Sequence, residues 1–256
     1  MPISAALAGS SRSARRAGYR IGTGPGIGCA TLKSSEGGPA RGNRPDDRET
    51  GVTRIVLMSG SLRRGSVNTT AVATLGRLLA RRDARVHTPL LDPRVLPYYD
   101  QDLDVADGPA PVAEARRLLA SADALVISTP SYNGGAPGVL KNALDWLSRP
   151  WGDSALTGLP TAVLSASPGP RGAADAQPGL RVNLERSGAV LIDHRPLALG
   201  DAEALPRTGQ GFTDQATVAL LDEVAAAVWA ARRTVVGVDV VRPAAGDGAP
   251  RPATVA

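Results

Sequence analysis

Aromatic residues, histidine and cysteine are scarce in this sequence of 256 residues, which has three Trp, four Tyr, one Phe, two His and one Cys. With Cys29 as the only cysteine, no intramolecular disulfide can form, and this usage is typical of a protein of the reducing cytoplasm, where we expect it. No apolar run approaches the length of a membrane span, so we expect no membrane-spanning segment. His87 and His194 lie far apart in the sequence, and a lone histidine is more often structural than catalytic.

Positive charge is in excess, but it is unevenly distributed. Residues 1–51 hold eight Lys and Arg against four Asp and Glu, whereas the remainder holds 21 against 20, so most of the formal +5 lies in the first 51 residues. A nucleic-acid-binding domain needs a basic face on its folded part. The nearly neutral remainder therefore predicts no nucleic-acid partner.

Residues 1–51 are rich in Gly, Ser, Pro and Arg and lack an apolar period, which predicts a disordered basic extension. Gly22–Gly28 resembles a dinucleotide-binding loop, but no strand precedes it, so a nucleotide site is not expected there. Arg15-Arg16 resembles a twin-arginine export signal, but the apolar segment of such a signal does not follow, so export is not expected. A natural start near Val52 is an alternative explanation of this extension. Residues 237–256, rich in Gly, Pro and Ala, are expected to be a frayed C-terminal tail.

Strand-like and helix-like apolar patterns alternate from Val52 onward, which predicts one α/β domain, residues 52–236, with a doubly wound five-stranded parallel sheet. The predicted strands are Val52–Met58, Ala84–Leu91, Ala124–Ser128, Thr161–Ser165 and Ala189–Ile192. The predicted helices are Asn68–Arg82, Pro111–Ser121, Val139–Leu147 and Thr213–Arg232, with a long irregular connection over Asp92–Pro109.

Three polar, glycine-containing loops follow predicted strands, at the edge where such sheets bind ligands. Loop one (residues 59–68) combines hydroxyls and two arginines at a helix start, where free backbone N–H groups favour a phosphate; a simple capped helix is the alternative. Loop two (residues 131–138) and loop three (residues 165–172) offer backbone donors to a planar group, or are tight connections only. Together the loops favour a mononucleotide with a ring system.

The segments GSLRRGSVN (60–68), TPSYNGGAPGVLKNALDWLSRP (129–150) and SASPGPRGAADAQPGLR (165–181) resemble the NADPH-dependent FMN reductase family of flavodoxin-like proteins. The resemblance implies bound FMN, NADPH or NADH as co-substrate, and a quinone, azo, nitro or similar small acceptor, or free flavin. It also implies a homodimer or homotetramer, with Tyr98, Tyr99 and Trp146 as candidates for the contact surface.

The site that this resemblance implies is divided among the three loops. The phosphate is expected at Ser61, Arg63, Ser66, Val67 and Asn68. The flavin ring is expected against Pro130, Ser131, Tyr132, Asn133 and Gly134, with Ser167 and Gly169 at its other edge. Asn133 and Gly134 would orient the flavin, and no catalytic side chain or metal is expected.

The sequence departs from the family pattern at two places. Ser131 occupies a position where the family usually has Glu, and Asp175 stands before Gln177 where an Arg is frequent. Pro178-Gly179 is expected to interrupt the helix that follows. Two other functions stay open: a flavodoxin-like electron carrier without enzymatic activity, and a flavin-free scaffold that binds partners.

Elsewhere, one lysine and three aspartates are of residue types used in catalysis or metal binding, but their context does not support such a role. Lys141 is expected on a helix surface rather than in a catalytic role. Asp100, Asp102 and Asp104 alternate along a loop, but they lack the other ligands of a calcium site.

Overall fold

A parallel sheet forms the centre of the computed structural model, which describes residues 52–106 and 108–235. The strand order is β2-β1-β4-β5-β6. The short strand β3 pairs with β1 on the same side as β2 and farther along β1, and β7 pairs with β5 in the same way beyond β6. The fold is therefore the flavodoxin-like doubly wound sheet that the sequence predicts. The predictions for residues 1–51 and 237–256 lie outside the described residues.

The elements follow in the alternating order of such a fold. The strands are β1 Thr53–Ser59, β2 Val86–His87, β3 Leu90–Leu91, β4 Ala124–Thr129, β5 Pro160–Ala166, β6 Val190–Leu191, β7 Ala198–Leu199, β8 Arg207–Thr208 and β9 Gly211–Phe212. The helices are α2 Val67–Ala80, α3 Ala110–Ala120, α4 Gly138–Leu147, α5 Gln177–Arg186 and α6 Gln215–Val235, with short 3-10 turns at Pro93–Val95, Gln101–Leu103 and Ala174–Ala176.

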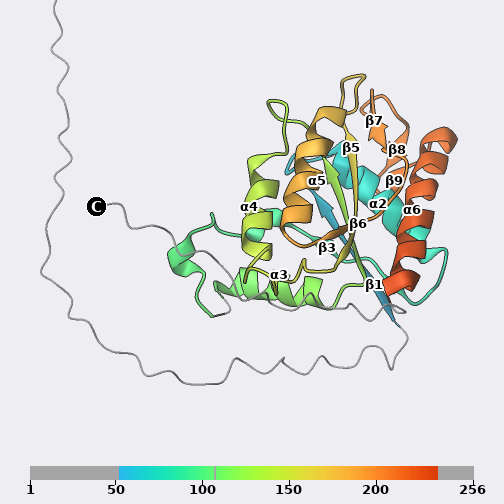
Figure 1. Ribbon diagram of the computed structural model, residues 1–256. Coiled ribbons are helices and arrows are strands. Elements are labelled where there is room, and N and C mark those ends of the chain that lie inside the picture. The colour runs from blue at the N-terminus through green and yellow to red at the C-terminus, as the bar shows by residue number, and fades with distance from the viewer. Residues whose placement is uncertain (1–51, 107, 236–256) are drawn as a thin grey trace, which may run out of the picture. The chain divides into compact units, whose positions relative to one another are not determined.

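Helices cover both faces of the sheet, as Figure 1 shows. Alternate residues of β1 point to opposite faces: Ile55 and Leu57 pack with α2 and α6, whereas Val56 and Met58 pack with α3, α4 and α5. The central strands are buried on both sides, which explains why β4 is a continuous apolar run with few polar residues.

The second predicted strand, Ala84–Leu91, is divided into β2 and β3, and the fifth, Ala189–Ile192, is followed by a further strand, β7, that the sequence does not predict; a proline lies in each gap. Thr88-Pro89 separates β2 from β3, and residues 192–197, which include Pro196, separate β6 from β7. Proline has no N–H for a ladder hydrogen bond, so regular pairing is interrupted there. The pairing partly continues, since the N–H of Leu57 donates to the carbonyl of Pro89 at 2.9 Å.

The expected interruption at Pro178-Gly179 is wrong, because α5 runs through both residues. Pro178 is the second residue of the helix. A proline in the first turn removes an N–H that has no intrahelical partner, so the helix tolerates it.

The long connection between β3 and α3 is held against α4. The indole Nε1 of Trp146 donates to the carbonyl of Pro97 at 2.8 Å, and the side chain of Asn142 donates to the same carbonyl at 2.9 Å. Arg116 and Asp104, both largely buried, form an ion pair at 2.7 Å under this connection. Trp146 is fully buried, so its expected place on a subunit surface is wrong.

Candidate functional site

The three loops all lie at the carboxyl-terminal edge of the sheet, which is the upper edge in Figure 1. Loop one follows β1, loop two follows β4 and loop three follows β5, and these three strands are neighbours. The strands that follow β1 are added first on one side of it and then, from β4 onward, on the other side, and doubly wound folds bind their ligands at this switch point between β1 and β4. The topology thus brings together the loops that the sequence singles out.

Loop one ends at a capped helix, and free backbone donors lie in the loop and at the first helical residue. The hydroxyl of Ser66 accepts from the N–H groups of Asn68 at 3.2 Å and Thr69 at 3.4 Å. The N–H groups of Leu62, Arg64, Gly65 and Val67 donate to none of the described residues. Free N–H groups at a helix start are suited to an anion, and both the cap and the anion site are compatible with this loop.

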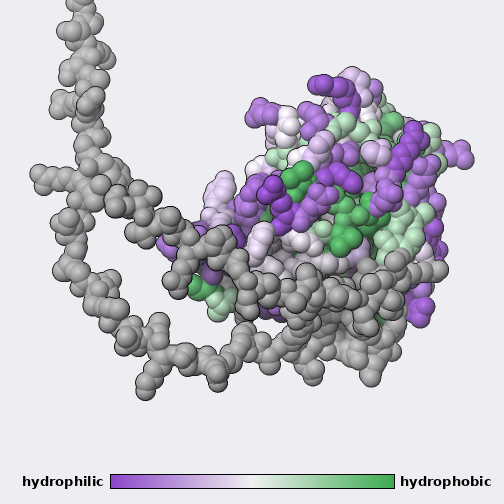
Figure 2. Space-filling model, in the orientation of Figure 1, coloured by the Kyte–Doolittle hydropathy of each residue, from purple (hydrophilic) through white to green (hydrophobic). Residues whose placement is uncertain are grey.

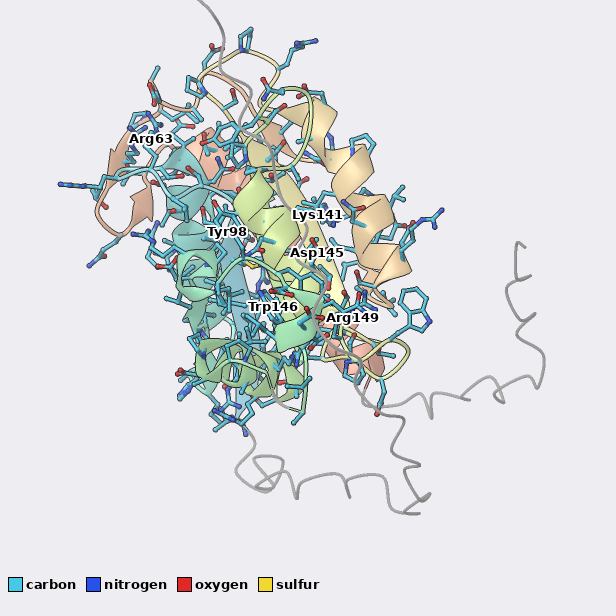
Figure 3. All side chains as sticks on the ribbon, turned by 90° about the vertical axis from the view of Figure 1, so that its left-hand side faces the viewer. Arg63, Tyr98, Lys141, Asp145, Trp146 and Arg149 are labelled. Carbon is cyan, nitrogen blue, oxygen red and sulfur yellow. The ribbon has the colours of Figure 1, made fainter. Side chains whose placement is uncertain are left out.

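Ser61 and Arg63 add side-chain donors to these backbone groups. Ser61 is buried, and its hydroxyl accepts from the N–H of Arg63 at 3.4 Å. The guanidinium of Arg63 is about half exposed and forms an ion pair with Glu203, from the segment between β7 and β8. In Figure 3, Arg63 lies at the upper end of the molecule.

Asn68 lies in the first turn of α2, but its carboxamide contacts two strands. Its Nδ2 donates to the carbonyl of Ala166 at 3.0 Å, and its Oδ1 accepts from the N–H of Ala166 at 3.1 Å. The same oxygen accepts from the hydroxyl of Ser128 at 2.8 Å. The side chain therefore joins the start of α2 to the ends of β4 and β5.

Loop two contains a tight two-residue turn. Tyr132 and Gly135 exchange backbone hydrogen bonds at 2.9 and 3.2 Å, and Asn133 and Gly134 between them have φ values of 54° and 81°. Two consecutive positive φ angles are characteristic of a type I′ turn, for which Asn-Gly is a favoured pair. The N–H groups of Asn133 and Gly134 donate to no described residue, so both are available to a ligand.

The residues on either side of this turn differ in their exposure. Pro130 is buried at the end of β4, whereas the ring of Tyr132 is 53% exposed. The hydroxyl of Ser131 donates to the carboxylate of Asp175 at 3.0 Å and so connects loop two with the segment after loop three. Ser131 and Asp175, the two residues that depart from the family pattern, are therefore hydrogen-bonded to each other.

Loop three is held tightly by the end of β7. The N–H of Gly169 donates to the hydroxyl of Ser167 at 3.0 Å, and the carbonyl of Gly169 accepts from the N–H of Asp201 at 3.2 Å. A Cβ on Gly200 would lie 2.1 Å from the carbonyl oxygen of Pro170, and one on Gly172, at φ +58°, would lie 2.6 Å from the backbone of Ala198. Only glycine fits these close approaches.

Three side-chain contacts near the loops were not expected from the sequence. Glu203 lies far along the chain from Arg63, and only the fold brings the two charges together. Ser128 and Ser165 are hydroxyl residues in otherwise apolar, buried strands. Because a buried hydroxyl needs a hydrogen-bond partner, their positions weakly indicated polar contacts at the strand ends. Ser128 bonds to Asn68, and Ser165 accepts from Gln177 at 2.8 Å.

The other sequence candidates lie outside this cluster of loops. Lys141 forms an ion pair with Asp145 on the surface of α4, where both are labelled in Figure 3. His194 bonds through Nδ1 to the carbonyl of Arg195 at 2.8 Å. Asp104 pairs with Arg116, and in the described part of the chain no group of three or more His, Cys, Asp or Glu is placed to hold a metal ion. No described helix is both long and apolar enough to span a membrane.

The donor set of the three loops suits FMN. Loop one offers N–H groups, hydroxyls and a guanidinium to a phosphate, and loop two offers two N–H groups to the polar edge of a ring. The fold and these loops define the class of flavodoxin-like mononucleotide-binding proteins.

Comparison with known sequences identifies the family. The model of the NADPH-dependent FMN reductase family matches residues 53–204, and the chain belongs to this family. The protein is therefore an oxidoreductase of the NAD(P)H-dependent FMN reductase and quinone reductase type, with FMN as cofactor.

Individual relatives are similar over most of the described residues. A quinone reductase of Escherichia coli (strain K12) is 35% identical over 170 residues, which are 64% of this chain and 87% of that protein. A 2-hydroxy-1,4-benzoquinone reductase of a Burkholderia species is 43% identical over 128 residues, or 50% of this chain and 68% of that protein. The solved structure of FerB, a flavoenzyme NAD(P)H:(acceptor) oxidoreductase from Paracoccus denitrificans, superposes with a TM-score of 0.64 at 34% identity, covering 72% of this chain and 98% of that chain.

Proposed function

We propose that this protein binds FMN across its three loops and uses NADH or NADPH to reduce a small acceptor, with quinones as the principal class. The observation that carries the proposal is that a helix start with free N–H groups and an Asn-Gly turn lie at the same edge of the sheet. Relatives with 35% to 43% identity that are named as quinone reductases support the acceptor class.

The phosphate of FMN is assigned to loop one. Its charge would be met by the guanidinium of Arg63, the hydroxyls of Ser61 and Ser66, and the free N–H of Val67. Charge-assisted hydrogen bonds of this kind are stronger than neutral ones, and the start of α2 adds its dipole. Loop one therefore supplies the anchor of the cofactor.

The flavin ring is assigned to the other two loops. Residues 130–134 would line one side, and Ser167 and Gly169 would border the opposite edge. Bound FMN supplies the redox chemistry, since it can take a hydride from a nicotinamide nucleotide and give electrons to an acceptor. The N–H groups of Asn133 and Gly134 orient the ring and interact with its polar edge, and the exposed Tyr132 leaves room for planar substrates beside it.

The contact between subunits is assigned to the connection between β3 and α3. Val95, Tyr98 and Val105 of this connection are 53%, 90% and 65% exposed. Figure 2 shows apolar surface where the connection projects at the lower left of the molecule. We expect a second copy of the chain to cover these side chains, because a homodimer removes such apolar surface from water.

Spectroscopy on the purified protein tests this function. The protein should carry, or take up, one FMN per chain, and anaerobic NADH or NADPH should bleach the flavin absorbance near its long-wavelength maximum. Addition of benzoquinone should restore that absorbance. A flavin that stays oxidised with both nucleotides would favour an electron carrier, and a protein that cannot be loaded with FMN would favour a flavin-free scaffold.

A further inference from the structure

Asn68 connects the three loops of the site, although its sequence position suggests a phosphate ligand. We propose that Asn68 is a positioning residue that holds the ends of β4 and β5, and with them the two ring-binding loops, in the arrangement that receives the flavin ring. This inference rests on the proposed FMN site and assigns a different task to one of its residues.

The contacts of the Asn68 carboxamide support this role. The residue is only 2% exposed, and its side chain forms three hydrogen bonds, two to the backbone of Ala166 and one to Ser128. The paired bonds to Ala166 resemble those of a neighbouring strand, so the carboxamide takes the place of a backbone at the end of β5. Its oxygen, with two donors already bound, is an acceptor and cannot bind an anion, and one N–H of Nδ2 is used by the carbonyl of Ala166, which leaves only the second N–H as a donor.

The neighbours of Asn68 show what these bonds hold in place. Ser66 and Val67, assigned to the phosphate, precede Asn68 directly, and the N–H of Asn68 is bound to the hydroxyl of Ser66. Ala166 precedes Ser167 of loop three, and Ser128 lies two residues before Pro130 of loop two. One side chain thus links the last residues of β4 and β5 to the helix start that receives the phosphate.

The end of β5 is held from its other side by a second buried amide. Gln177, the first residue of α5, donates through Nε2 to the hydroxyl of Ser165 and the carbonyl of Leu197, both at 2.8 Å. Loop three therefore begins from a strand end whose position is constrained on both sides. Of the two buried amides, only Asn68 also belongs to loop one. Its loss therefore removes the link between the end of β5 and loop one.

Binding of FMN and riboflavin to the full-length apoprotein separates positioning from direct phosphate contact, because riboflavin has the same ring and no phosphate. We expect Asn68→Ala to weaken both ligands by the same factor, roughly tenfold, on the scale of a lost hydrogen bond. Arg63→Ala is the matched control and should weaken FMN while leaving riboflavin unchanged. Ser128→Ala, which removes one of the three bonds, should weaken both ligands equally but less.

Flavin fluorescence quenching gives the affinities, and thermal unfolding shows whether each variant is folded. If Asn68→Ala does not fold, the milder Ser128→Ala carries the test. A loss of FMN affinity alone in the Asn68 variant would make this residue a phosphate ligand, and unchanged affinities in folded variants would make its role purely structural; either result overturns the proposal. Failure of the wild-type apoprotein to bind FMN would instead contradict the proposed function.

Discussion

Arg63 and Glu203 together determine the charge that loop one presents to an anion. Their ion pair is partly exposed, and pairs of this kind contribute only about 0–1 kcal/mol. A phosphate that carries close to two negative charges can therefore compete with Glu203 for the guanidinium. Each partner of the pair leads to a separate prediction.

Arg63→Ala should weaken FMN binding by roughly 1 to 3 kcal/mol, because charge-assisted hydrogen bonds to the phosphate are lost. Titration of the apoprotein with FMN measures this change. The adjacent Arg64 is a suitable control, since its exposed side chain lies in the same loop and is not assigned to the phosphate. Equal losses in the Arg63→Ala and Arg64→Ala variants would place the phosphate elsewhere.

Glu203→Gln should have the opposite effect. Removal of the carboxylate frees Arg63 and reduces repulsion of the phosphate, so FMN should bind more tightly by up to about fivefold at low salt, the scale of an exposed ion pair. The gain should shrink as ionic strength rises, because exposed charges are screened. Isothermal titration at two salt concentrations would test this, and weaker FMN binding by the variant would show that Glu203 orients Arg63 instead.

At the scale of elements, the connection from β5 through loop three to β7 depends on glycines that have no space for a side chain. Gly172 and Gly200 lie against backbone atoms at distances that no Cβ can tolerate. Neighbouring glycines such as Gly179 have no such contact. Loop three and β7 therefore pack backbone against backbone at these two glycines.

Gly200→Ala should lower the free energy of unfolding by about 1–3 kcal/mol or more and weaken FMN binding, because the new methyl group collides with the carbonyl of Pro170. Chemical denaturation and FMN titration measure the two effects. Gly179→Ala, in the first turn of α5, is the control and should be neutral or stabilising by up to about 1 kcal/mol. Equal stability of both variants would mean that loop three can move away from β7.

The start of α6 makes part of the stability dependent on pH. The carboxylate of Asp214 accepts at 2.8 Å from the N–H and at 2.8 Å from the hydroxyl of Thr217, and these hydrogen bonds hold the pKa of Asp214 below its ordinary value of 3.8. A lowered pKa in the folded state means that the ionised group stabilises the fold above the ordinary pKa. This contribution is lost as the pH falls through the lower, folded-state value.

Asp214→Ala should therefore lower the melting temperature at neutral pH, and the difference from wild type should diminish as the medium becomes more acidic than pH 4. Asp214→Asn is the matched control, because Asn also caps helices but does not titrate. Differential scanning calorimetry from pH 7 down to the acid limit of folding provides the measurement. If the difference in melting temperature between Asp214→Ala and wild type did not change with pH, the stabilisation would not come from the ionised carboxylate of Asp214.

At the scale of the whole molecule, the long connection has one buried side and one exposed side. Tyr99 packs edge-on against Trp146, with ring centroids 4.8 Å apart, whereas the adjacent Tyr98 is 90% exposed. The buried side is attached to α4 by the hydrogen bond from the indole of Trp146 to the carbonyl of Pro97. The exposed side is therefore available for contact with a second copy.

Tyr98→Asp should convert the proposed dimer to a monomer, because a charge at the contact must be desolvated without a partner. Light scattering coupled to size-exclusion chromatography measures the mass in solution. Val182→Asp is the control, since Val182 is 48% exposed on α5, away from this connection. Dissociation by the Val182 variant and not by the Tyr98 variant would assign the interface to α5.

Much of the fold could be predicted from residue patterns. The strands β1, β4 and β5 and the helices α2, α3 and α6 follow from apolar periodicity, because burial on one or both faces selects those periods. Less predictable were the division of the second strand at Pro89, the short strand β7 after Pro196, the passage of α5 through Pro178, and the small hairpin β8–β9. These features depend on short segments whose neighbours in space determine their conformation.

The sequence by itself determined the alternation of strands and helices, the family, and the three loops to which the proposed site is assigned. Those features are local, since they arise from periodicity and from residue types that favour turns and helix starts. Only the tertiary structure decided the pairing of Arg63 with Glu203, the burial of Trp146, and the bonds of Asn68 to Ser128 and Ala166, which are 60 and 98 residues away. The physical reason is that hydrogen bonds and ion pairs need atoms within about 3–4 Å, and the sheet order alone brings such distant residues together.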